Sequence, residues 1–141
     1  MKRLVSHSRV DTVALGADYG AGLKPGDVVA LIGELGSGKT SFVAGACRAF
    51  GLEEQVSSPT FTMINEYRGN RQAVAHVDLY RIDKREELAE LGIDEYFAEP
   101  WVCFVEWAER AGSLLPPRTR RVTFVHGRSS EERVVTLDPD L

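Results

Sequence analysis

The fold is decided by residues 28–40, "VVALIGELGSGKT". The first five of these residues are apolar and have turn-forming residues on both sides, which is typical of a strand buried on both faces of a parallel sheet. Residues 33–40 fit the pattern GxxxxGK[ST], the phosphate-binding P-loop. The stretch therefore predicts a buried strand, a P-loop and then a helix over residues 39–50, ended by Gly51.

Each residue type in this loop has a physical role. Glycines let the chain take positive φ angles and let backbone N–H groups approach phosphate oxygens, while the following helix turns its positive end to the anion. Lys39 adds a charge for the β and γ phosphates, and the Thr40 hydroxyl is placed to ligate Mg²⁺. The loop is thus expected to hold a nucleoside triphosphate with magnesium.

Two acidic residues follow predicted strands. Glu106 comes directly after "WVCFV", and Asp78 comes directly after "AVAHV". Either carboxylate can hold Mg²⁺, and either can orient or deprotonate an attacking water. Both are therefore candidate catalytic residues, with Lys39, and candidate metal ligands, with Thr40. Spacing alone does not divide the two roles between them.

Residues 57–61, "SSPTF", lie where a loop that senses the nucleotide is expected. Pro59 favours an extended Ser58 and leaves the Thr60 hydroxyl free to contact Mg²⁺ or the γ phosphate in one nucleotide state. An ordinary Ser/Pro turn explains this stretch equally well. His76, in the following strand pattern, is interpreted as a structural histidine in preference to an acid/base group.

Before the loop, the sequence predicts a helix capped by Ser8, with Asp11 in the reciprocal capping position. Its apolar residues continue to Leu23, and "LKPGD" ends it. After the loop, residues 61–67 and 72–80 predict an antiparallel pair joined by a tight turn at Gly69 and Asn70. The remaining expected elements are a helix over 84–92, a strand over 101–105, a helix over 108–117 and a closing hairpin over 120–138.

This alternation of strands and helices predicts an α/β fold. With 141 residues, 43% of them hydrophobic, the chain has the size of one domain, residues 1–141, with one core. The expected architecture is a single-domain P-loop NTPase with a mixed, mostly parallel central sheet flanked by helices.

Composition restricts the partners and the compartment. The formal net charge of −4 repels phosphate backbones, so a nucleic-acid contact would need a local basic patch. Arg118, Arg120 and Arg121 are interpreted as a solvated loop, with a partner or RNA contact as the alternative. Cys47 and Cys103 are expected to be reduced core residues. Without a signal-peptide pattern or a membrane-length apolar run, we expect a cytoplasmic protein.

Several motifs together resemble one family, the bacterial TsaE (YjeE) ATPases. They are "LKPGDVVALIGELGSGKTSF", "SSPTF", "NEY", "HVDLYR", "LGIDEYF", "VEWAER" and the late Arg133, in the order and approximate spacing of that family. The P-loop is widely shared, but SPTF, HxDLYR and EW in succession are highly specific. The departures are Glu34, where the family often has Asp, and Ser57, where Thr is frequent.

The resemblance implies an ATPase that binds the TsaD and TsaB proteins and supports formation of threonylcarbamoyladenosine next to the anticodon of tRNAs that read ANN codons. ATP, ADP and Mg²⁺ are the implied cofactors, and tRNA is expected to be reached only through the complex. The implied nucleotide-binding residues are Gly33, Glu34, Leu35, Gly36, Ser37, Gly38, Lys39, Thr40, Ser41, Thr60 and Thr12.

Three other functions share a P-loop. A small-molecule kinase needs an acceptor pocket and an arginine-bearing lid, for which 141 residues leave little chain. A regulatory GTPase needs NKxD and DxxG motifs, which the sequence lacks. A nucleotide-gated adaptor is close to the TsaE interpretation, because an isolated P-loop protein without an arginine finger hydrolyses slowly. Arg81 and Arg110 are candidates for transition-state charge only by their position near the motifs.

Overall fold

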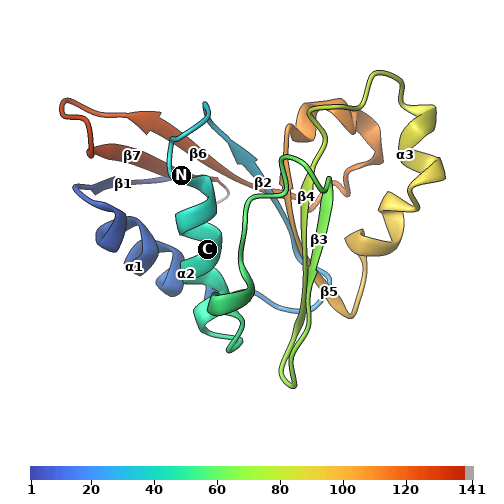
Figure 1. Cartoon of the computed structure of the whole chain (residues 1–141), viewed down its shortest axis with the longest axis horizontal. Coiled ribbons are helices and arrows are strands. Elements are labelled where there is room, and N and C mark those ends of the chain that lie inside the picture. Colours follow the sequence, from blue (N-terminus) through green and yellow to red (C-terminus); the bar gives the residue numbers. More distant parts are fainter. Residues whose placement is uncertain (139–141) are drawn as a thin grey trace.

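The computed structural model describes residues 1–138, which form one seven-stranded sheet in the order β1-β7-β6-β2-β5-β4-β3 (Figure 1). The last three residues of the predicted domain, 139–141, lie outside the described residues. The strands are β1 (Lys2–Ser6), β2 (Val28–Ile32), β3 (Ile64–Tyr67), β4 (Ala73–Asp78), β5 (Trp101–Glu106), β6 (Arg120–His126) and β7 (Arg133–Asp138). The α-helices are α1 (Arg9–Gly20), α2 (Lys39–Arg48) and α3 (Glu86–Glu90).

The centre of the sheet is parallel and its margins are antiparallel. β6, β2, β5 and β4 are parallel neighbours, whereas β1 with β7, β7 with β6, and β3 with β4 pair in opposite directions. This confirms the predicted α/β fold with a mixed sheet. Because the central strands run the same way, the carboxyl ends of β2, β4 and β5 meet at one edge, where ligands bind in open α/β sheets.

The two faces of the sheet are covered by different layers. α1 and α2 lie together on one face with the 3₁₀ turn at Glu53–Gln55, and α3 with the later 3₁₀ turns lies on the other (Figure 1). On the first face, Phe42 of α2 packs against Phe124 of β6 with ring centroids 5.3 Å apart. On the second, Leu88 of α3 is fully buried against the valines of the central strands.

Glycines allow α1 and α2 to touch through their backbones. A Cβ added at Gly16 would lie 2.2 Å from the Phe42 carbonyl oxygen, and one added at Gly45 would lie 2.0 Å from that of Val13. Only glycine permits so close an approach. The Ser8 cap is confirmed, since its hydroxyl accepts from the Asp11 N–H at 3.1 Å. The Asp11 carboxylate, however, accepts from the N–H of His7 instead of that of Ser8.

Five local predictions differ from the structure. α1 ends at Gly20, although Leu23 beyond it is buried. The expected tight turn at Gly69 and Asn70 is a longer connection between β3 and β4. The helix expected over 108–117 is two 3₁₀ turns, because Gly112 has a φ of 51° and two prolines follow. The helices over 39–50 and 84–92 are shorter than expected, as α2 and α3 show.

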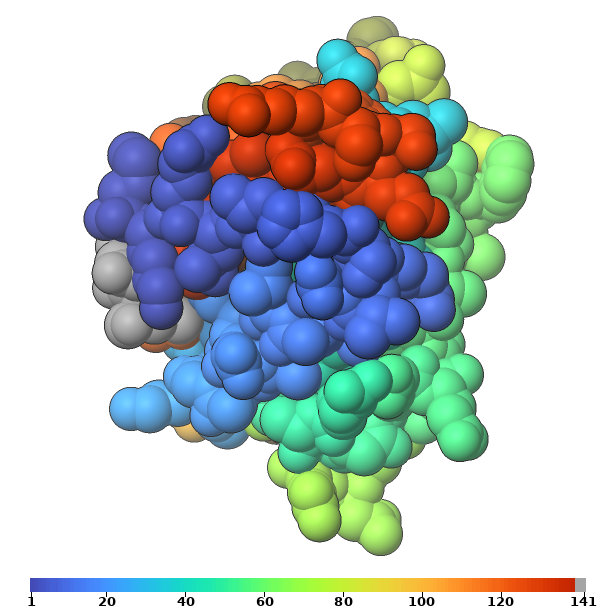
Figure 2. All heavy atoms as spheres, turned by 90° about the vertical axis from the view of Figure 1, so that its left-hand side faces the viewer, coloured from blue at the N-terminus to red at the C-terminus, as the bar shows by residue number. Residues whose placement is uncertain are grey.

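The first strand was not predicted at all. β1 pairs antiparallel with β7, so the two ends of the described chain lie side by side. Figure 2 shows the blue N-terminal segment packed against the red C-terminal strands. β1 is short and mostly exposed, and its residues offer no apolar alternation long enough to mark a strand.

Candidate active site

The P-loop connects β2 to α2 and turns its backbone toward an open pocket. Gly36 and Gly38 have φ angles of 75° and 104°, in the left-handed region that favours glycine. Gly38 is the N-cap of α2 and has no side chain with which to cap it. The first-turn N–H groups of α2 therefore point toward the loop, where they suit an anion.

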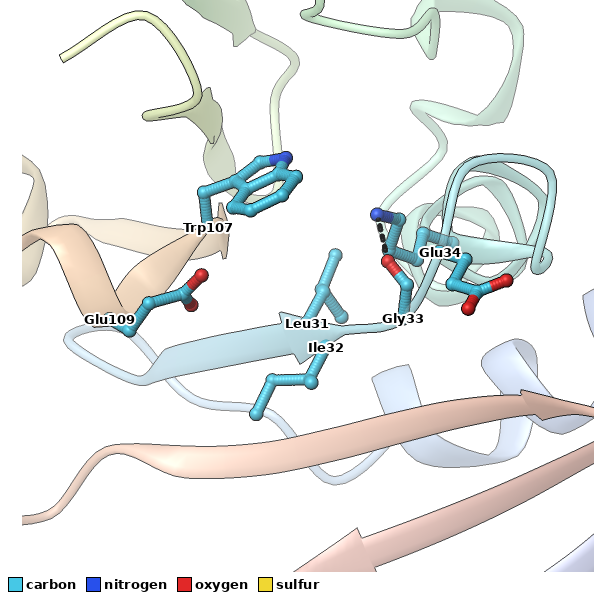
Figure 3. Close-up of a pocket in the computed structure, with 7 residues that line it drawn as sticks. Leu31, Ile32, Gly33, Glu34, Trp107 and Glu109 are labelled. Carbon is cyan, nitrogen blue, oxygen red and sulfur yellow. Dashed lines mark hydrogen bonds between the residues drawn. The ribbon is translucent and has the colours of Figure 1, made fainter.

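Two side chains of the loop region reinforce this preference for an anion. The Lys39 ammonium donates to the Gly33 carbonyl at 2.7 Å, the contact dashed in Figure 3, and lies 3.4 Å from Glu106 Oε1. The Ser37 hydroxyl is buried and finds no hydrogen-bond partner within residues 1–138. A buried unpaired hydroxyl and a lysine next to free helix N–H groups fit a polyphosphate group.

The two acids are direct neighbours across parallel strands. Asp78 ends β4, Glu106 ends β5, and the two residues are paired in register. Each is only 5% exposed. An Asp78 oxygen accepts from the Tyr80 N–H at 2.8 Å, whereas Glu106 lies between Lys39 and the His76 ring, whose Nε2 is 2.8 Å from Glu106 Oε2. The sheet register thus brings together two carboxylates that the sequence separates by 28 positions.

The surroundings of the two acids shift their pKa values in opposite directions. Burial raises the pKa of Asp78, and the negative charge of Glu106 adds to this, while the Tyr80 N–H opposes it. Burial also favours a raised pKa at Glu106, but the His76 hydrogen bond and the Lys39 charge more than offset it and lower the pKa. Glu106 is therefore held as a carboxylate, and Asp78 is the more basic of the two.

The loop at residues 57–61 lies across the pocket from the P-loop. Thr60 lines a cavity of about 320 Å³ together with Lys39, Asp78 and Glu106. It also lines a smaller one of about 210 Å³ with Thr40 and the P-loop. Its hydroxyl is 2.8 Å from that of Ser58. The predicted proximity of Thr60 to the site is confirmed, while its role as a sensor stays a prediction.

A separate cavity lies on the other side of the P-loop. Its volume is about 230 Å³, and Thr12, Gly38, Ser41 and Arg133 are among its lining residues. Thr12 is buried and shares a 2.7 Å hydrogen bond with the Ser6 hydroxyl. Arg133 donates to the Gly36 carbonyl at 3.1 Å. Arg133 was part of the family resemblance but not of the predicted site, and the structure places it against the P-loop.

The remaining predicted loop residues face outward. Leu35 is 90% exposed at the tip of the P-loop. Glu34 lines a pocket of about 310 Å³ with Trp107 and Ile32, and Figure 3 shows the Trp107 ring across this pocket from Gly33 and Glu34. Trp107 has a positive φ of 57°, which is rare for a bulky residue and places strain next to the catalytic candidate Glu106.

His76 is the site residue that the sequence interpretation missed. It was expected to be structural, yet its fully buried ring contacts Glu106 directly. The available signal was its position two residues before Asp78, which puts both side chains on one face of β4. Tyr67 of β3 contacts the same ring at 3.1 Å.

The arginine candidates are engaged within the chain. Arg110 donates to the Ile82 carbonyl at 2.6 Å and stacks near Tyr80 and Trp107. Arg81 stacks 5.5 Å from the centre of the Phe61 ring. The stretch expected to be a solvated loop holds structural contacts: Arg118 bonds two carbonyl oxygens, and Arg120 pairs with Asp27.

The two cysteines fit the sequence expectation, since Cys47 and Cys103 are both buried and free. Within the described residues, no helix has the length and apolar character needed to cross a membrane.

The parallel sheet centre, the glycine-rich loop between β2 and α2, and the lysine that begins α2 define a P-loop NTPase. Comparison of the whole sequence is more specific. The family described as "Threonylcarbamoyl adenosine biosynthesis protein TsaE" matches residues 6–135. The chain therefore belongs to the TsaE family, whose role is in tRNA threonylcarbamoyladenosine biosynthesis.

Individual relatives agree with this assignment. The tRNA threonylcarbamoyladenosine biosynthesis protein TsaE of Bacillus subtilis (strain 168) is 39% identical over 127 residues, which are 90% of this chain and 78% of the relative. The protein of the same name from Treponema pallidum (strain Nichols) is 41% identical over 117 residues, covering 83% and 86%. The crystal structure of Bacillus subtilis YdiB matches with a TM-score of 0.79 and 32% identity, over 96% of this chain and 83% of that one.

Proposed function

We propose that the protein is a Mg²⁺-dependent ATPase that binds TsaD and TsaB and supports the formation of threonylcarbamoyladenosine next to the anticodon of tRNAs that read ANN codons. One observation carries the proposal. Lys39, Thr60 and the two acids Asp78 and Glu106 line one cavity beside the P-loop. A phosphate-binding loop facing two carboxylates and a hydroxyl is the arrangement that hydrolysis of a nucleoside triphosphate needs.

The P-loop backbone and Lys39 bind the phosphates in this proposal. The Lys39 ammonium already lies at the loop, so it exchanges its contact with the Gly33 carbonyl for phosphate oxygens. Thr12 and Arg133, beyond the P-loop, are placed to hold the nucleoside end of the ligand. ATP is preferred to GTP because the sequence has no guanine-reading motif.

In this proposal the two acids and the Thr40 hydroxyl have different roles around the phosphates. Within residues 1–138, no group of three His, Cys, Asp or Glu side chains is arranged to hold a metal by itself. Magnesium commonly uses one or two carboxylates together with the substrate phosphates. Glu106 lines the same cavity as Thr40, so these two are the favoured ligands; bound Mg²⁺ supplies charge neutralisation. Asp78, with its raised pKa, is left to orient water.

Slow hydrolysis by the protein alone is part of the proposal. The candidate arginines Arg81 and Arg110 are engaged elsewhere, and a P-loop site without an arginine finger turns over slowly. TsaD and TsaB are expected to change this rate, and tRNA to be reached through their complex. The cytoplasmic location remains a prediction.

The proposal is tested by replacing Glu106. Glu106→Ala should keep the affinity for ATP within about threefold, because the P-loop and Lys39 still bind the phosphates, but lower kcat at least about 100-fold, because Mg²⁺ that is no longer held by this carboxylate neutralises the transition-state charge less well. Glu90→Ala, on the exposed face of α3, is the matched control and should retain both values. Parental turnover in Glu106→Ala would show that this acid is not catalytic.

A further inference from the structure

A chain of close polar contacts runs from the loop at residues 57–61 to Glu106. His76 Nε2 is 2.8 Å from Glu106 Oε2, and His76 Nδ1 is 3.1 Å from the Tyr67 hydroxyl. Tyr67 in turn donates to the Ser57 carbonyl at 2.8 Å and accepts from the Ser57 N–H at 3.1 Å. The proposed function gives Tyr67 and His76 no role, although "NEY" and "HVDLYR" stood out in the sequence.

The middle of this series of contacts, His76 and Tyr67, is buried. His76 is fully buried and Tyr67 is 3% exposed. A buried polar atom that loses its partner keeps the full cost of leaving water, so neither side chain can drop a contact freely. A change at Ser57 therefore has an energetic effect at Glu106, and the reverse, although these two residues do not touch.

The donors and acceptors along the chain can be assigned from its geometry. A carboxylate only accepts, so the proton on the His76 ring lies on Nε2 and points to Glu106. A ring that carries only this proton leaves Nδ1 as an acceptor. Tyr67 has a single hydroxyl proton and two acceptors for it, the Ser57 carbonyl and His76 Nδ1. Strengthening one of these bonds weakens the other.

The loop is also tied to the second acid. The Met63 carbonyl, just after the loop, accepts from the Asp78 N–H at 2.7 Å, and Met63 has a positive φ of 66°. Asn65 of β3 donates to the Ser57 carbonyl at 3.2 Å, so this oxygen keeps a partner when Tyr67 turns away. The loop can therefore shift at Ser57 while its far end remains attached to β4.

We propose that Tyr67 and His76 are positioning residues that couple the loop at residues 57–61 to the Glu106 carboxylate. When Ser57 moves away, the Tyr67 proton turns to His76 Nδ1, and this polarises the ring and strengthens its donation to Glu106. Fixing Glu106 more tightly favours the loop position in turn, because coupling acts both ways. The inference rests on the proposed function only where it treats Glu106 as a carboxylate that hydrolysis needs.

The first test needs no catalysis. Amide hydrogen exchange at residues 57–61 is measured without nucleotide in the parental protein, His76→Gln and Glu106→Ala. Gln can still donate to Glu106 but does not reach Tyr67 as Nδ1 does. Both variants should change exchange at the Ser57 N–H about two- to tenfold, the span of one hydrogen bond, although neither residue touches the loop. Glu54→Gln, an exposed neighbour of the loop, is the control and should leave exchange unchanged.

The amides of β7 serve as an internal reference, since unchanged exchange there shows that the fold is intact. Parental exchange at Ser57 in both His76→Gln and Glu106→Ala would overturn the coupling. This result is independent of whether the protein hydrolyses ATP, so failure of the coupling and failure of the proposed function are distinguishable.

The second test separates positioning from general stability. Tyr67→Phe keeps the ring and should lower kcat about two- to tenfold at an unchanged KM for ATP. His76→Gln should retain more of kcat than His76→Phe, because only Gln can still donate to Glu106. Equal kcat values in Tyr67→Phe and the parental protein, or in His76→Gln and His76→Phe, would contradict a positioning role.

Discussion

The two faces of β4 and β5 use the same strands in different ways. On the α2 face these strands carry His76, Asp78 and Glu106, all buried and all polar. On the α3 face the alternate positions, such as Val77 and Val105, are buried and apolar. Because strand side chains alternate between faces, one strand can contribute to the site and to the core at once. The difference indicates that the chemistry is confined to the ends of these strands on the α2 face, since the rest of that face, with Val74, Val102 and Phe104, contributes to the core as the α3 face does.

We expect the largest effect from a substitution at the polar site, where Lys39 begins α2. Lys39→Ala removes the only positive side-chain charge of the P-loop, residues 33–40, and we expect ATP affinity to fall on the order of 100-fold, the upper range for charged hydrogen bonds. Isothermal titration with ATP measures this loss. Lys24→Ala, an exposed lysine in the turn before β2, should bind normally. Equal ATP affinities in the two variants would show that the P-loop lysine does not contribute to ATP binding.

The next largest effect concerns the packing of α1 on α2. Gly45→Ala puts a methyl group against the Val13 carbonyl and should destabilise the fold by about 2.5 kcal/mol through overpacking. Gly22→Ala is the matched control, since its Cβ would meet only an ordinary contact at 3.7 Å. Urea unfolding measures the free energy of unfolding of both variants, which should fall only in Gly45→Ala. A stable Gly45→Ala would mean that the helices are not in backbone contact.

A substitution on the apolar face separates stability from chemistry. Val105→Ala, next to Glu106 in β5, should lower the free energy of unfolding by about 2 kcal/mol from lost burial and a small cavity. Its kcat per folded molecule should stay at the parental value. Loss of turnover with unchanged unfolding would contradict the division between the two faces.

The smallest effect is a gain in stability at the site itself. The pKa of Asp78 is raised in the folded state, so its contribution to folding is present below the unfolded pKa and is lost as pH rises through the folded value. Asp78→Asn stays neutral and should raise Tm near neutral pH. The gain should shrink as pH falls toward the ordinary aspartate pKa of 3.8.

Thermal unfolding across this pH range tests the effect, with exposed Asp83→Asn as the control. A lower Tm for Asp78→Asn at neutral pH would show that the carboxylate stabilises the fold and does not strain it.

Much of this arrangement could be predicted because its signals are local. The P-loop pattern placed Lys39 and Thr40 at the start of a helix, and the apolar run before it placed a buried parallel strand, as found. β1 could not be predicted, because its pairing with β7 joins residues more than 120 positions apart and its own residues carry little pattern. Strand formation there depends on tertiary pairing.

The link through His76 was missed for the same reason. A histidine in a strand pattern is more often structural, and only the register of β4 on β5 shows that its ring reaches Glu106. The order of the motifs predicted two candidate acids at strand ends, but their pairing as neighbours, and the opposite shifts of their pKa values, arise from burial and contacts that no short stretch of sequence contains.

The most direct measurement is steady-state ATP hydrolysis by the purified protein, alone and with purified TsaD, TsaB and tRNA, with GTP as a parallel substrate. We predict slow turnover of ATP in preference to GTP, with a rate that changes strongly when TsaD, TsaB and tRNA are added. No hydrolysis under any of these conditions would contradict the proposed ATPase, and hydrolysis indifferent to TsaD, TsaB and tRNA would contradict its proposed coupling to tRNA modification.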